Sequence, residues 1–143
     1  MVDQNILLSK LGYIEKNLVY LESLGKIKEE DFLESPFLTG AAKYYLQTCI
    51  EAMLDIANHV IARERYRAPD NYVDALRVLG EHGILPNNDL QGFYQMARFR
   101  NRIVHLYQEV DNKEVYKILQ TGLDDFKSFI RAIMSSFFYH EPL

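Results

Sequence analysis

The sequence has little of the residues that staple or interrupt small proteins: one cysteine, four prolines and no tryptophan in 143 residues. The lone Cys49 excludes an intramolecular disulfide framework and a cysteine-rich metal site. Because disulfides are rare in reducing compartments, this usage favours the cytoplasm. No apolar run approaches the roughly 18 residues of a membrane span, and the N-terminus lacks the basic and apolar regions of a secretory signal. These absences together predict a cytoplasmic protein that is not exported.

The composition is that of a folded chain, with 48% hydrophobic residues and a net charge of -4. This length suits one domain with a real core, so we expect a single helical domain over residues 1–143. The mild negative charge argues against a general polyanion-binding protein, although a small basic site remains compatible with it. Four scattered histidines and one cysteine give no metal-ligand spacing, and no glycine-rich phosphate loop is present. We therefore predict neither metal nor cofactor.

Apolar residues recur at helical spacing along most of the chain, and no segment alternates like a strand. A first helix would be capped by Asp3 and ended by Gly25. The stripe of this helix is Leu7, Leu11, Ile14, Leu18 and Leu21. Further helices are expected over residues 28–34 (short), from Thr39 to about Arg65, over 71–81 after an Asp70 cap, over about 90–109, and from Asp111 for some 25 residues. The predicted fold is all-α, an up-and-down helical bundle of four long helices plus one or two short ones.

The most distinctive stretch is residues 98–107, which holds three arginines, a histidine and a tyrosine with no acidic residue. Counted at about 100° per residue, Arg100 and Tyr107 fall near the middle of a wide apolar arc. Burying an unpaired guanidinium costs about 2 kcal/mol or more in folding free energy, so Arg100 should face a wet cleft or an anion. Asn101 and His105 flank the arc. Its width also predicts a second partner surface, such as a dimer interface.

Arg98 and Arg102 point outward on the same helical projection. They are candidates for electrostatic contacts with an anionic partner, which weaken with salt. The alternative is that they solvate the helix surface or pair with nearby acids. On the preceding long helix, Asp55 and His59 stand one turn apart and could pair.

The spacing from Arg100 and Asn101 to His105 and Tyr107 resembles the R-x4-H-x-Y signature of the HEPN superfamily, and the whole chain resembles its HepT-like toxin branch. The shared features include three segments outside this motif: residues 45–47, 54–59 and 69–72. The resemblance implies a metal-independent ribonuclease toxin, active as a homodimer in which two motif helices form one composite site. Its antitoxin would be a nucleotidyltransferase of the MntA type.

The resemblance makes Arg98 and Arg102 candidates for contacts with RNA phosphates. The residue types of the motif also fit the chemistry of RNA cleavage. Metal-free RNA cleavage needs a base for the 2′-hydroxyl proton, an acid for the leaving 5′-oxygen and a cation for the crowded phosphate. His105 suits either proton-transfer role, Arg100 suits the cationic role, and Asn101 could orient the histidine or a phosphate. On a straight helix Arg100 and His105 would lie about 140° apart, which favours two copies around one phosphate.

The resemblance assigns Tyr107 a second role, as the residue to which the antitoxin transfers AMP. Added bulk and negative charge beside His105 would block the substrate phosphate. Alternatively, Tyr107 is an amphipathic residue at a helix end. For the whole site, two alternatives remain: Arg100 and His105 as a purely structural pair, or a non-catalytic module that binds a nucleotide or a partner protein.

Overall fold

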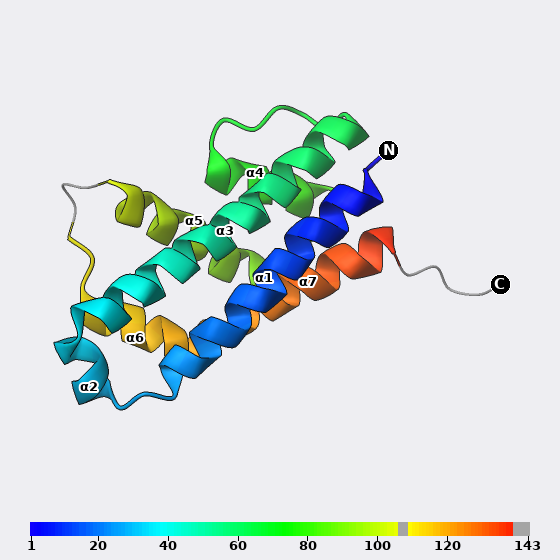
Figure 1. Cartoon of the computed structure of the whole chain (residues 1–143). Coiled ribbons are helices and arrows are strands. Elements are labelled where there is room, and N and C mark those ends of the chain that lie inside the picture. Colours follow the sequence, from blue (N-terminus) through cyan, green and yellow to red (C-terminus); the bar gives the residue numbers. More distant parts are fainter. Residues whose placement is uncertain (106–108, 139–143) are drawn as a thin grey trace.

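The computed structural model describes residues 1–105 and 109–138. Within these ranges the chain forms seven α-helices and no strand (Figure 1). The helices are α1 (Gln4–Gly25), α2 (Glu29–Glu34), α3 (Pro36–Glu64), α4 (Tyr72–Glu81), α5 (Leu90–Val104), α6 (Asn112–Thr121) and α7 (Asp124–Phe137), with a 3-10 turn at Asn87–Asp89. The all-α bundle is confirmed. No helix in the described ranges is long and apolar enough to cross a membrane.

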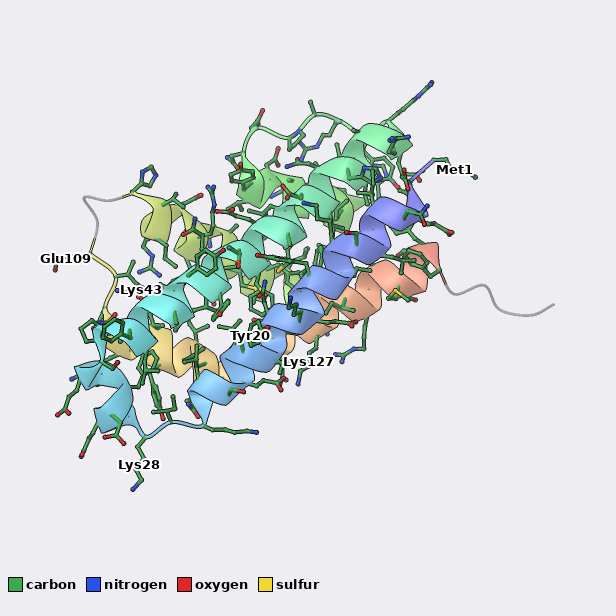
Figure 2. All side chains as sticks on the ribbon, viewed as in Figure 1. Met1, Tyr20, Lys28, Lys43, Glu109 and Lys127 are labelled. Atoms are coloured by element: carbon green, nitrogen blue, oxygen red, sulfur yellow. The ribbon has the colours of Figure 1, made fainter. Side chains whose placement is uncertain are left out.

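Helices α1 and α3 are the two longest helices of the described ranges, and they lie side by side and antiparallel (Figure 1). Asp3 caps α1, since its carboxylate accepts from the backbone N–H groups of Asn5 and Ile6 at 3.0 and 3.2 Å. The predicted stripe of α1 is buried throughout. Figure 2 shows Met1 beside the C-terminal end of α3, where its ammonium donates to the carbonyl of Arg63 at 3.0 Å.

Helix α3 begins earlier than the sequence indicated. Ser35, not Thr39, is the N-cap: its hydroxyl accepts from the N–H of Leu38 at 3.2 Å, and Pro36 occupies the first turn. The hydroxyl of Thr39 instead donates back to the carbonyl of Ser35 at 3.1 Å. A similar correction applies to α4, which is capped by Asn71 rather than Asp70.

The second half of the chain departs from two predicted boundaries. The motif helix α5 ends at Val104 instead of continuing to 109, and the expected final helix is two helices, α6 and α7. The break lies at Gly122, whose N–H donates to the carbonyl of Ile118 at 2.8 Å and ends α6. Helical spacing of apolar residues continues across this break, because both α6 and α7 bury one face in the same core.

Helix α3 is the centre of the bundle, since α1, α2, α4, α5 and α6 all pack against it. Its buried face includes Cys49, which is fully buried and donates weakly to the carbonyl of Ile14 at 3.7 Å. Burial raises the pKa of this thiol to about 12. Helix α5 packs against both α3 and α4, and its opposite flank borders a cavity toward α6.

Candidate active site

Arg100 projects from α5 into a partly closed setting built by α3 and α4. Its Nε donates to Oε1 of Glu51 at 3.4 Å, and its guanidinium carbon lies 5.0 Å from the centroid of the Tyr72 ring. The side chain keeps 20% of its surface exposed. Arg100 was expected to face an anion or a wet cleft, and the anion that it faces is the carboxylate of Glu51.

Within residues 1–105 and 109–138, the contacts of Arg100 leave most of its N–H donors unused. A guanidinium has five N–H donors, and the two side-chain contacts it makes, to Glu51 and to Oδ1 of Asn101, are both 3.4 Å long. Strong charge-assisted hydrogen bonds are about 2.7–2.9 Å long. These two contacts hold the guanidinium in place but leave N–H donors that an external anion, such as a phosphate, can accept from.

Asn101 lies beside two of the three segments that carry the resemblance to the HEPN superfamily, residues 54–59 and 69–72. One hollow of about 320 Å³ is lined by Asn101, by Asn58 of α3 and by residues 69–72 at the start of α4. A second, of about 380 Å³, is lined by Asn101, Arg98 and three residues of the α4 region. Segments far apart in sequence are thus gathered against the motif helix.

His105 is the residue that ends α5. Its backbone is extended, with φ -87° and ψ 101°, and the residue is exposed. The angle of about 140° between Arg100 and His105 assumed a helix continuing past His105. Because α5 ends at Val104, that angle does not describe the site and gives no support for two copies around one phosphate. Tyr107 lies outside the described residues.

The two outward arginines differ. Arg98 is exposed and makes no ion pair within residues 1–105 and 109–138. Arg102 forms a two-pronged ion pair with Glu114 of α6, with Nη1 to Oε2 at 2.9 Å. The hydrogen bonds to Glu114 raise the pKa of Arg102. Arg102 therefore joins α5 to α6 instead of pointing freely outward, while Arg98 remains available.

The suggested pairing of Asp55 with His59 is not present. Asp55 forms an ion pair with Lys10 at 3.0 Å. Nε2 of His59 accepts from the backbone N–H of Asp3 at 3.0 Å, and burial is the first cause of a lowered pKa for this imidazole. Both residues fasten α1 to α3 and lie outside the motif site.

Sequence reasoning missed Glu51 and Tyr72 as neighbours of Arg100. The signal was available in general form, because an arginine in an apolar seam requires a nearby anion. It could not select among the 20 acidic residues of the chain. The order of the helices in space decides which carboxylate reaches Arg100.

The arrangement agrees with comparisons to known proteins. The family model described as "Ribonuclease HepT-like" matches residues 14–133. The mRNA nuclease HepT of Shewanella oneidensis is 27% identical over 132 residues, covering 90% of this chain and 96% of that protein. The tRNA nuclease HepT of Aphanizomenon flos-aquae is 24% identical over 134 residues, covering 94% of this chain and 91% of that protein.

A solved structure extends the likeness to three dimensions. The tri-AMPylated HEPN toxin of Shewanella oneidensis, in complex with MNT antitoxin, has a TM-score of 0.85 and 27% identity, covering 94% of this chain and 99% of that one. The resemblance first indicated by the spacing of Arg100 and His105 is therefore supported along almost the whole chain. The chain belongs to the HepT-like ribonuclease family.

Proposed function

We propose that this protein is the RNA-cleaving toxin of a toxin–antitoxin pair and that it cuts RNA without a metal ion, using Arg100 and His105. The observation that carries the proposal is the position of Arg100, five residues before an exposed histidine. Glu51 and Tyr72 hold its guanidinium, and most of its N–H donors have no partner among the described residues. The names of the HepT relatives support RNA as the substrate class.

In this mechanism Arg100 binds oxygens of the scissile phosphate and stabilises the charge that develops on them. His105 takes the proton of the attacking 2′-hydroxyl or gives one to the leaving 5′-oxygen, since an imidazole exchanges protons near neutral pH. Asn101 contacts Arg100 at 3.4 Å and acts as a positioning residue for the guanidinium or a phosphate. Arg98 attracts the RNA backbone. Arg102 contributes less to this attraction, because Glu114 neutralises it.

The same chemistry supports a homodimer. Cleavage by proton transfer needs both a base and an acid. The other described histidines serve elsewhere, because His59 accepts from Asp3 and His82 is stacked on Tyr66 with ring centroids 3.5 Å apart. A second copy of the chain would supply a second imidazole, so the complete site is proposed to form where two motif helices meet.

Tyr107 is proposed as the site at which a nucleotidyltransferase antitoxin silences the toxin by transferring AMP. The AMPylated state of the Shewanella toxin supports this type of control. The phosphate of AMP would carry negative charge to within two residues of His105 and repel the substrate phosphate. Incubation with the cognate transferase and ATP, followed by peptide mass spectrometry, tests the assignment, and an adduct on a different tyrosine would remove Tyr107 from this role.

The nuclease proposal is tested by digesting RNA with purified protein in the presence of a chelator. We expect the wild type to cleave and His105→Ala to lose at least about 100-fold in rate, the usual scale of general acid–base catalysis. His82→Ala is the matched control, because it removes a histidine distant from the motif, and circular dichroism checks that both variants stay folded. Equal rates for His105→Ala and wild type would refute the site. Binding of RNA without cleavage would favour the non-catalytic module.

A further inference from the structure

A cavity of about 680 Å³ lies on the flank of α5 that faces α6 and α7. This volume is within the usual range of small-molecule sites, about 300–1,000 Å³. Its lining includes buried apolar residues from three helices. They are Leu46 and Ile50 of α3, Met96 and Phe99 of α5, and Phe126 of α7. The cavity thus offers an apolar floor on which a flat ring can rest.

The rim of this cavity carries positive charge. Arg98 and Lys117 both line it, and neither takes part in the ion pairs of the described residues. Arg102 also lines it, but its charge is compensated by Glu114 across the cavity wall. An apolar floor beneath two uncompensated cations suits a ligand that is both aromatic and anionic, as a nucleotide is.

Asp125 adds a hydrogen-bond acceptor. Its carboxylate lies against Gly92 of α5, so closely that a Cβ at position 92 would come within 2.7 Å of Oδ2. Burial, followed by the charges of Asp89 and Asp124, raises the pKa of this carboxyl. No ion pair or side-chain hydrogen bond within residues 1–105 and 109–138 satisfies it. A carboxylate so placed favours a ligand that brings N–H donors.

We propose that this cavity binds one unpaired guanine base of the RNA substrate, a few nucleotides from the phosphate that is cleaved. The ring lies on the apolar floor, the N–H donors of its Watson–Crick edge bond to Asp125, and the adjoining phosphates contact Arg98 and Lys117. Asp125 lies against Gly92, which is 13 residues before His105, about 20 Å of helix rise. The cavity extends along α5 from Gly92 to Arg102, so one RNA strand a few nucleotides long can reach both the cavity and the motif. The inference rests on the proposed ribonuclease function and deepens it by naming single-stranded, guanine-containing RNA.

The choice of guanine follows from donor patterns. Guanine presents two adjacent N–H groups, N1–H and N2–H, which match the two oxygens of one carboxylate. Adenine and cytosine pair each amino donor with a ring acceptor that would face the second oxygen. Uracil presents one N–H between two carbonyl oxygens, which a carboxylate repels. Unpaired bases in RNA are commonly read on this edge, with the ring stacked or packed on the protein.

The test measures binding of uncleavable 2′-O-methyl oligonucleotides to the full chain by fluorescence anisotropy. Two strands are compared, a uridine strand with one central guanosine and the same strand with uridine throughout. We expect the wild type to prefer the guanosine strand by about tenfold, a modest value for paired hydrogen bonds to one base. Asp125→Asn should abolish the preference. Asp124→Asn, which changes the exposed neighbouring carboxylate, should keep it.

Lys117→Gln provides an independent readout, because losing a phosphate contact should weaken both strands equally and reduce the salt dependence by about one counterion. A wild-type protein without preference, or an Asp125→Asn protein that keeps it, would overturn the guanine site. If RNA is still cut in a His105-dependent manner, only the inference has failed. If the preference depends on Asp125 but no RNA is cut, the base site stands and the nuclease proposal has failed.

Discussion

Substitution of Glu51 by glutamine separates a phosphate-binding Arg100 from a purely structural one. The Nε–Oε1 distance is 3.4 Å, and the side chains of Arg100 and Glu51 are 20% and 36% exposed. With an effective dielectric constant of about 20, the attraction across such a distance is about 5 kcal/mol before desolvation. Exposed pairs retain about 0–1 kcal/mol net. Glu51→Gln should therefore lower the free energy of unfolding by less than about 1 kcal/mol.

Its effect on activity should run in the opposite direction. The amide of glutamine can still accept a hydrogen bond from Arg100, but it no longer competes with phosphate for the positive charge. We expect KM for RNA to fall while kcat stays within a factor of about 3, the pattern of a change that affects binding of the substrate and of the transition state equally. Urea unfolding and steady-state cleavage of a fluorescent RNA measure the two effects.

Asp55→Asn is the matched control, because it breaks an exposed ion pair with Lys10 at a similar distance, 3.0 Å, away from the motif. It should change stability slightly and cleavage not at all. A loss of more than about 3 kcal/mol of stability in Glu51→Gln, the scale of a broken buried ion pair, would contradict a phosphate-binding role for Arg100. In that case Arg100 would be an anchor of the bundle.

Three further predictions follow from the described side chains. Two hydrogen bonds from Arg67, at 2.8 Å each, hold the pKa of Asp74 well below its usual range, so the ionised carboxylate stabilises the fold at neutral pH. This stabilisation is lost as the pH falls below about 4, and Asp74→Asn should therefore make the melting temperature depend less on pH in that range. Asp125 has the opposite effect on stability, because its raised pKa means that the folded state favours the protonated acid and loses stability as the pH rises through that pKa. Asp125→Asn should therefore raise the melting temperature at neutral pH, and a lower melting temperature would contradict the environment assigned to this carboxyl. Cys49, with a pKa near 12, should react with a thiol reagent such as Ellman's only after unfolding, and rapid labelling of the native protein would show that it is not buried.

The helices were predictable where apolar residues recur on one face and a capping residue marks the start. The stripe of α1 from Leu7 to Leu21 and the cap at Asp3 are both as expected, because burial and capping act locally. The errors occur at boundaries. Gly122 ends α6 while apolar spacing continues into α7, and α5 ends at Val104 with no proline or glycine to mark it. Such ends depend on packing between helices, which one sequence does not display.

The sequence indicated the family of the chain but not the arrangement of side chains around Arg100. The spacing from Arg100 to His105 pointed to the HepT-like family, which the comparison over residues 14–133 confirms. The partners Glu51 and Tyr72 come from helices that precede α5, and the pairing of Arg102 with Glu114 depends on how α6 returns to the bundle. Contacts of this kind are set by tertiary packing, so a helical projection could place Arg102 outward but could not assign its partner.

If Arg100 and His105 cleave RNA by metal-free attack of a 2′-hydroxyl, as proposed, the new RNA ends carry the products of that attack. Mass spectrometry of RNA digested in the presence of a chelator determines the chemistry of these ends. We expect 2′,3′-cyclic phosphate and 5′-hydroxyl ends, no cut at a position carrying a 2′-deoxy sugar, and loss of these products in both Arg100→Ala and His105→Ala. Ends bearing a 3′-hydroxyl and a 5′-phosphate, or unchanged products from either variant, would contradict the proposal.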